Sequence, residues 1–169
     1  EMKICVDEKG TPINVVSRDR GLSEMMIEDF MLAANEAVAE TLFHLKYPCC
    51  YRVHEEPNKE RLTNVNNILK AIGEEIKNID KGVKPKQLQR LMNNIKGTAA
   101  EDSVNTLLLR AMAKARYDSM PLGHYGLAAQ YYCHFTSPIR RYPDLQTHRM
   151  ITDLLINKNN IDESLNHYN

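Results

Sequence analysis

The chain has 169 residues, 43% of them hydrophobic and 26% charged, which is ordinary composition for a globular domain. Lys plus Arg and Asp plus Glu each total 22, so any polyanion binding has to come from a local basic cluster. No stretch approaches the roughly 20 apolar residues of a membrane span, so we expect no membrane partner. The four cysteines have no disulfide-framework spacing and indicate reduced thiols in the cytoplasm.

Two short runs of β-branched residues, Ile4–Val6 and Ile13–Val16, flank Gly10 near the start of the chain. Such runs around a glycine turn predict a β-hairpin. Because a lone hairpin is only marginally stable in water, we expect its strands to complete a sheet that begins upstream. The chain is therefore expected to be a piece of a longer protein.

Apolar residues at 3.6-residue spacing predict four helices in the middle of the chain. The predicted ranges are 23–45, 62–72, 85–95 and 98–115, with a short strand at 51–54. Met26 and Phe30 mark the apolar face of the first helix. Gly73 is the expected C-cap of the second helix, and Pro85 opens the third. Thr98 and Glu101 have the spacing of a capping box for the fourth.

The C-terminal part of the chain adds a β segment and one more helix. The Tyr-rich segment 124–135 predicts a strand pair or one long bent strand, and a last helix is predicted from about Pro138 to Ile156. Residues 156–169 are polar and Asn-rich, which indicates a frayed tail. The predicted fold class is α/β in the sense of an α-rich mixed α+β fold, with about five helices.

Motifs for metal or nucleotide chemistry are missing from the sequence. It contains no C-x-x-C, H-x-H, H-E-x-x-H, Walker, G-x-G-x-x-G or G-x-S-x-G pattern. Zinc binding, nucleotide cradling and a serine-hydrolase elbow are therefore not predicted, and no residue of the chain is assigned as a metal ligand.

The segment TSPIRRYPD is the most informative part of the sequence. Ser137 before Pro138 predicts an N-cap followed by a first-turn proline, and Arg140 and Arg141 follow in the first turns. The Thr136 and Ser137 hydroxyls, free N–H groups and two guanidiniums would together suit the oxygens of a phosphate.

A structural interpretation of the same segment stays open. At about 100° per residue, one face of the predicted helix carries Arg140, Arg141, Asp144 and His148, and the same stripe continues as Ile151 and Leu155. A polar stripe that runs into an apolar one predicts partly buried polar groups. The alternative to phosphate binding is thus an Arg–Asp pair that only fixes the loop before the helix.

The first helix carries a second candidate. Glu28 and Asn35 are seven residues apart and fall on one helical stripe. The alternative for Glu28 is an ordinary solvated helix position.

Four segments of the chain resemble a known family. SEMMIEDFMLAANEAVAE, YRVHEEPN, LLLRAMAKARY and GHYGLAAQYYCHFTSPIRRYPDLQTHRMI are similar, in this order, to the catalytic (RNB) domain of the ribonuclease R/ribonuclease II exoribonucleases. The resemblance covers nearly the whole chain, and the bacterial ribonuclease R branch fits best.

The resemblance implies a processive 3′→5′ exoribonuclease that hydrolyses single-stranded RNA to 5′-mononucleotides with a divalent metal such as Mg²⁺. In the family an upstream aspartate cluster binds the metal. Residues 1–169 would then be the C-terminal part of an RNB domain, inactive alone. Its partners would be single-stranded RNA and the rest of its own polypeptide: the upstream half-domain, cold-shock-type domains and an S1-type domain.

The resemblance also implies roles for single residues. The arginine of SPIR falls on Arg140, which in the family assists the scissile phosphate, where a fixed guanidinium stabilises developing charge. The first acid of the IEEFM-like motif falls on Glu28, which implies a contact with a ribose near the 3′ end and selection of RNA by its 2′-OH. Further RNA-binding candidates are Asn35, Tyr125, Thr136, Ser137 and Arg141.

Two other classes of function remain open from the sequence. One is a non-catalytic RNA-binding module that has kept the fold. The other is a helical interaction domain in which TSPIRRYPD is only a helix cap and a salt bridge.

Overall fold

The computed structural model describes residues 2–17 and 21–157. The chain divides into two units, Glu1–Ala34 and Asn35–Asn169, and each is described by itself. In the described ranges no helix is both long and apolar enough to cross a membrane.

The first unit opens with the predicted hairpin, which is confirmed. Strands β1 (Met2–Val6) and β2 (Pro12–Ser17) pair antiparallel. Gly10 adopts a φ of 80° in the turn, and the Asp7 carboxylate accepts two N–H groups of the turn at 2.9 and 2.8 Å. Apolar side chains of both strands are exposed, namely those of Met2, Ile4, Val6, Ile13 and Val15.

Helix α1 (Leu22–His44) has residues in both units and matches the prediction to within one residue at each end. Its buried positions are Asn35, Ala39 and Leu42, all in the second unit. The predicted apolar face at Met26 and Phe30 is exposed at 50% and 64%. This part of the expected core is therefore wrong for the described residues.

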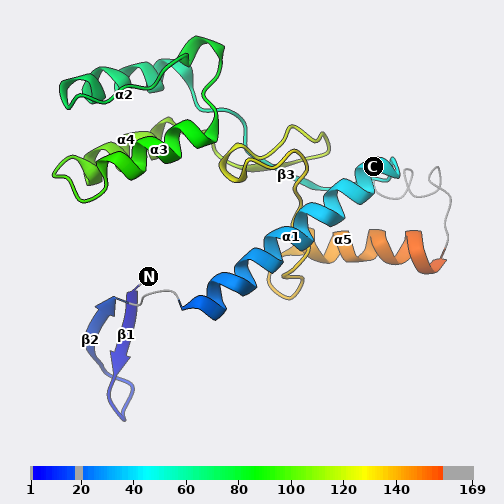
Figure 1. The fold of residues 1–169 in the computed structure, drawn as a ribbon. Helices are drawn as coiled ribbons and strands as arrows, with labels where there is room; N and C mark the ends of the chain where they lie inside the picture. The colour runs from blue at the N-terminus through cyan, green and yellow to red at the C-terminus, as the bar shows by residue number, and fades with distance from the viewer. Residues whose placement is uncertain (1, 18–20, 158–169) are drawn as a thin grey trace. The chain divides into compact units, whose positions relative to one another are not determined.

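The second unit contains a three-helix lobe, which we define as residues 59–111. Helices α2 (Lys59–Ala71), α3 (Pro85–Ile95) and α4 (Glu101–Ala111) lie side by side (Figure 1). Their apolar stripes form one core, whose buried members include Leu62, Val65, Leu69, Leu88, Leu91, Ile95, Val104 and Leu108.

The caps of the lobe helices differ in part from the prediction. The predicted capping box is wrong: α4 begins at Glu101, whose carboxylate accepts the N–H of Gly97 at 2.6 Å, while Thr98 donates to the carbonyl of Ile95 at 2.6 Å. Helix α4 ends at Ala111, before the predicted residue 115. The chain then becomes extended and forms a strand that was not predicted.

A second core surrounds a small sheet. Strands β3 (Tyr51–Val53) and β4 (Arg116–Asp118) pair antiparallel. The core combines residues of α1, the α1–β3 connection, β3, the 133–135 segment and α5 (Tyr142–Thr152), namely Ala39, Leu42, Tyr47, Cys49, Tyr51, Val53, Cys133 and Met150. After α5 a short π-helical segment, Asp153–Asn157, follows.

The segment 124–135 is neither the predicted strand pair nor one long bent strand. It forms a 3₁₀ turn at Tyr125–Leu127 and isolated bridges. Its backbone bonds the region of β3 instead: the carbonyl of Tyr132 accepts the N–H of Arg52 at 2.8 Å, and the N–H of Tyr125 donates to the carbonyl of His54 at 2.7 Å. The aromatic pattern therefore reflects packing along one short strand, not a ladder of its own.

The last helix begins four residues later than predicted. Helix α5 starts at Tyr142 with Pro143 in its first turn, where a proline costs no helical hydrogen bond. Before it, the N–H groups of Arg140 and Arg141 both bond the carbonyl of Ser137, at 3.3 and 3.2 Å, in a turn. Of the predicted tail, residues 156–169, those from 158 onward lie outside the described residues.

Candidate functional site

Residues 133–141, here named the arginine loop, are held on one side by Asn35 of α1. The Asn35 side chain is 3% exposed. Its Oδ1 accepts the N–H groups of Phe135 and Thr136 at 3.0 and 3.2 Å, and its Nδ2 donates to the Tyr132 hydroxyl at 3.1 Å. The Asn35 amide thus shapes the loop, and a direct contact of Asn35 with RNA stays a prediction.

The other side of the arginine loop is held by Asp144 of α5. This carboxylate is fully buried, and its Oδ1 accepts both the N–H of Ser137 and a guanidinium N–H of Arg141, each at 2.7 Å. A buried carboxylate needs such charge-assisted bonds to offset its lost hydration. The Arg–Asp pair considered in the sequence therefore exists, and its arginine is Arg141.

These contacts change the predicted phosphate site. The N–H groups at 136 and 137 are taken by Asn35 and Asp144, and no helix starts at Ser137. The expected anion site of free N–H groups at Ser137 is therefore wrong. The RNA-binding roles of the Thr136 and Ser137 hydroxyls stay predictions; Thr136 Oγ1 is buried and has no hydrogen-bond partner among the described residues.

The two arginines of the loop differ in environment. Arg140 is exposed, contrary to the predicted burial, and follows the fully exposed Ile139. No carboxylate of the described residues lies within ion-pair distance of Arg140, whereas Arg141, with a side chain 21% exposed, is tied to Asp144. Arg140 is thus the exposed guanidinium of the loop, with no carboxylate partner among the described residues.

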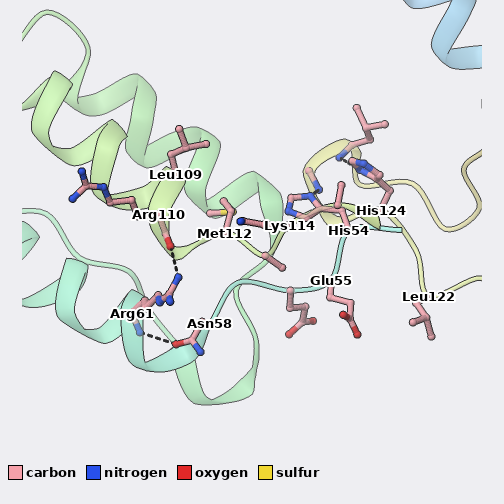
Figure 2. Close-up of a pocket in the computed structure, with 15 residues that line it drawn as sticks. His54, Glu55, Asn58, Arg61, Leu109, Arg110, Met112, Lys114, Leu122 and His124 are labelled. Carbon is pink, nitrogen blue, oxygen red and sulfur yellow. Dashed lines mark hydrogen bonds between the residues drawn. The ribbon is translucent and has the colours of Figure 1, made fainter. Parts of the chain in front are cut away.

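A large open pocket of about 1600 Å³ lies elsewhere in the second unit. Figure 2 shows Asn58 and Arg61 of the α2 side, Leu109 and Arg110 of α4, and His54 and His124 around it. Its charged lining residues are of both signs, namely Glu55, Glu56, Arg61, Arg110 and Lys114. None of the RNA-contacting residues predicted from the sequence lines this pocket.

The two pocket histidines are fixed by backbone donors. Gly126 and Leu127 donate their N–H groups to Nδ1 of His54 and His124 at 3.0 and 3.2 Å, and the rings lie 5.1 Å apart. Burial, and then the neighbouring His54, lowers the pKa of His124 to about 4, so this ring is neutral at pH 7. A Cβ at Gly126 would lie 2.9 Å from the His54 ring, which explains the glycine.

Tyr125 joins this turn to the three-helix lobe. Its hydroxyl donates to the carbonyl of Val83 at 2.6 Å, and burial raises its pKa to about 12. The hydroxyl is therefore used inside the fold, and its predicted contact with RNA stays a prediction. Glu28 lies in the first unit, on an exposed part of α1.

The described residues do not form a metal centre. Within the ranges 2–17 and 21–157, no group of three or more His, Cys, Asp or Glu side chains is arranged to hold a metal ion. What the described residues offer at this site is a cationic loop and its supports.

Sequence reasoning found the arginines of the loop but missed two residues beside it. Tyr117 of β4 and Arg52 of β3 are paired across the small sheet, and Tyr117 reaches His134 of the loop. A weak signal for them existed, because both lie in the segments YRVHEEPN and LLLRAMAKARY that carry the resemblance.

Comparison with known proteins identifies the class of domain. The family model for the RNB domain matches residues 1–157. The chain belongs to the RNB domain family, which confirms the resemblance seen in the sequence.

The similar proteins include several named ribonuclease R. The chain is 47% identical to ribonuclease R 1 of Lactococcus lactis, over 91% of this chain and 19% of that protein. It is 46% identical to ribonuclease R of Thermotoga maritima, over 89% of this chain and 21% of that protein. The chain thus spans about a fifth of the length of these relatives.

Solved structures agree with this assignment. Mycoplasma genitalium RNase R in complex with ribose-methylated single-stranded RNA matches with a TM-score of 0.85 at 34% identity, over 97% of this chain and 26% of that one. Yeast Ssd1, described as a pseudonuclease, matches with a TM-score of 0.71 at 25% identity, over 84% of this chain and 18% of that one.

Proposed function

We propose that the full protein is a processive 3′→5′ exoribonuclease that hydrolyses single-stranded RNA to 5′-mononucleotides. Residues 1–169 supply the C-terminal part of its RNB catalytic domain. The observation that carries the proposal is the exposed Arg140 on a loop fixed by two buried side chains, in a chain 47% identical to a ribonuclease R.

Arg140 acts at the scissile phosphate. Attack of water on phosphorus builds negative charge on the phosphate oxygens, and a guanidinium already in position stabilises that charge without reorganisation. Asn35 and Asp144 limit the movement of the loop backbone that carries Arg140. Arg141 is committed to Asp144 and supports the loop, so its contribution to RNA binding is indirect.

Glu28 selects RNA over DNA through the ribose 2′-OH, which only RNA offers as a donor and acceptor. Replacing Glu28 by Ala in the full protein should lower the ratio of the RNA degradation rate to the DNA degradation rate, measured on matched oligomers. Glu36→Ala, another exposed acid of α1, is the control. An unchanged ratio in Glu28→Ala would leave Glu28 an ordinary solvated residue.

Other parts of the full protein complete the enzyme in this proposal. Mg²⁺ is held by an aspartate cluster upstream of this chain, as the resemblance to the family implies. Cold-shock-type and S1-type domains bind the RNA further along its length, and the protein works in the cytoplasm.

The experiment uses the full protein with 5′-labelled single-stranded RNA and Mg²⁺. Shortening from the 3′ end with release of 5′-mononucleotides supports the proposal, and intact RNA after prolonged incubation contradicts it. Residues 1–169 alone should leave the RNA intact. RNA bound by the full protein but never shortened would favour a non-catalytic RNA-binding module, a reading supported by the similarity to the pseudonuclease Ssd1.

A further inference from the structure

The small sheet places an arginine over an aromatic ring beside the arginine loop. Arg52 of β3 lies directly opposite Tyr117 of β4 in the antiparallel register, so both side chains emerge on the same face. The Arg52 guanidinium lies 4.7 Å from the centre of the Tyr117 ring, a distance at which the ring attracts the cation. Tyr117 remains 39% exposed, so solvent reaches this pair.

Tyr117 connects the pair to the loop. Its hydroxyl lies 2.8 Å from Nδ1 of His134, with the two rings edge to face. His134 is anchored in turn, because its carbonyl accepts from the Thr147 hydroxyl of α5 at 3.2 Å. Arg52, Tyr117 and His134 therefore form one connected cluster, held at the loop that carries Arg140.

The Arg52 guanidinium is not neutralised by a direct ion pair. Burial lowers the pKa of His134 to about 4, and Arg141 and Arg52 lower it further than Asp144 raises it. Asp144 is already paired with Arg141. The nearby acids Glu55 and Asp118 both pair with Arg116. No carboxylate among the described residues lies within ion-pair distance of Arg52.

We propose that Arg52, Tyr117 and His134 form a second phosphate subsite, which binds one backbone phosphate of the RNA other than the scissile one. The proposal rests on the proposed function. Arg52 supplies the charge and a planar fork of donors suited to phosphate oxygens. The Tyr117 ring holds the guanidinium in place from one side. With the Tyr117 hydroxyl donating to Nδ1, the neutral His134 keeps its proton on Nε2 as a further donor.

The experiment measures RNA binding by the full protein in EDTA, so that no hydrolysis occurs. Each RNA oligomer carries one uncharged methylphosphonate at a single linkage, stepped along the strand from the 3′ end. Wild-type protein should lose about tenfold in affinity when the contacted linkage is neutralised, as for a lost hydrogen bond between charged groups. In Arg52→Gln, neutralising that linkage should no longer lower the affinity, whereas neutralising any other linkage should lower it as in the wild-type protein.

Two variants sharpen the test. Arg149→Gln removes an exposed arginine of α5 and should leave the loss at every linkage unchanged. Arg52→Lys keeps the charge without the fork and should retain a reduced effect at the same linkage, so it tests the subsite even if Arg52→Gln folds poorly. If the affinity loss caused by Arg52→Gln or Arg52→Lys adds to the loss caused by the methylphosphonate at every linkage, the variant is coupled to no single phosphate. That result overturns the subsite.

Failure of the subsite is distinguishable from failure of the proposed function. Additive affinity losses in a protein that shortens RNA overturn the subsite alone. A fall in the thermal stability of Arg52→Gln would then point to a carboxylate elsewhere in the polypeptide as the partner of Arg52. A coupled linkage in a protein that never shortens RNA supports the subsite and overturns the exonuclease. A protein that binds no RNA overturns both.

Discussion

The three-helix lobe and the arginine loop are stabilised by different means. In the lobe, apolar side chains from helices of 11 to 13 residues form the core. The loop is held by two buried polar side chains, Asn35 and Asp144, the first about 100 residues away in sequence. Apolar packing tolerates small shifts, whereas hydrogen bonds fix direction and distance. The lobe is thus built for stability and the loop for positioning.

The largest effect is expected from Asp144→Ala. It leaves the partly buried Arg141 guanidinium and the Ser137 N–H unpaired, and removing one partner of a buried pair costs up to about 3–5 kcal/mol. Native-state hydrogen exchange should show faster exchange in residues 133–141 and unchanged exchange in the lobe. Asp144→Asn keeps an acceptor for the Ser137 N–H, so the exchange rates of residues 133–141 should lie between those of the wild-type protein and Asp144→Ala. Unchanged exchange in the loop would show that Asp144 does not hold it.

The reverse experiment is Leu69→Ala in the lobe. Leu69 is fully buried, and such a truncation costs about 2–5 kcal/mol through lost contacts and a cavity. Exchange should accelerate in α2, α3 and α4 but not in the arginine loop. Ile68→Ala, at a neighbouring position 47% exposed, is the control and should change little. Equal acceleration in both regions would break the comparison between them.

Arg140→Ala should separate catalysis from stability. In the full protein, turnover should fall roughly 10²-fold, about 2.7 kcal/mol, as for the loss of one preorganised donor. RNA binding should fall much less, because phosphate contacts are spread over many nucleotides. Arg140→Lys should rescue poorly, since an ammonium lacks the planar fork. Single-turnover kinetics and RNA binding in EDTA measure the two effects.

Two controls accompany Arg140→Ala. Arg141→Ala should affect binding or stability more than turnover, because Arg141 supports the loop through Asp144. Arg90→Ala, at an exposed position of α3, should leave turnover unchanged. Near-normal turnover in Arg140→Ala with lost turnover in Arg141→Ala would shift the catalytic assignment by one residue.

The smallest effect concerns pH. The pKa values of His124 and His134 are lowered from the usual 6.5 to about 4, chiefly by burial. Between about pH 6.5 and 4 these two imidazoles are protonated in the unfolded chain but remain neutral in the folded chain. The free energy of unfolding therefore decreases as the pH falls from about 6.5 to 4. Residues 59–111 contain no histidine, so the lobe lacks this contribution.

Hydrogen exchange at pH 7.0 and 5.0, corrected for the intrinsic rate, tests this. Opening of the 122–135 region should become easier at pH 5.0 relative to opening of the lobe. His124→Asn retains an acceptor for the Leu127 N–H and has no titrating ring, so it should flatten the dependence. If the 122–135 region loses the same local stability between pH 7.0 and 5.0 in the wild-type protein and in His124→Asn, the pH dependence does not come from the His124 ring.

Local sequence patterns predicted the regular elements well. The hairpin, α1 and α3 match the predicted ranges closely, because β-branched runs around Gly10 and 3.6-residue spacing act over neighbouring residues. The errors occur where distant contacts decide. Residues 124–135 bond the β3 region instead of pairing as strands, and Met26 and Phe30 have helical spacing but remain exposed.

The start of α5 shows how two valid local signals can compete. Ser137-Pro138 and Arg141-Tyr142-Pro143 both allow a helix to begin with a proline in the first turn. A start at Pro138 would place Pro143 in the second turn, where its missing N–H and its ring are costly. The later start avoids that cost, and Asp144 then receives the Ser137 N–H from outside the helix.

The sequence by itself determined the RNB domain, the helices and the two adjacent arginines as the candidate site. The resemblance pointed to Arg140 as the catalytic arginine, but residue type alone did not show which of the two arginines is exposed, because Arg140 and Arg141 carry the same charge and lie in the same motif. Only the tertiary structure decided this. Asp144 lies in the core and needs a cation and an N–H to offset its lost hydration, so it takes Arg141 and Ser137 and leaves Arg140 exposed.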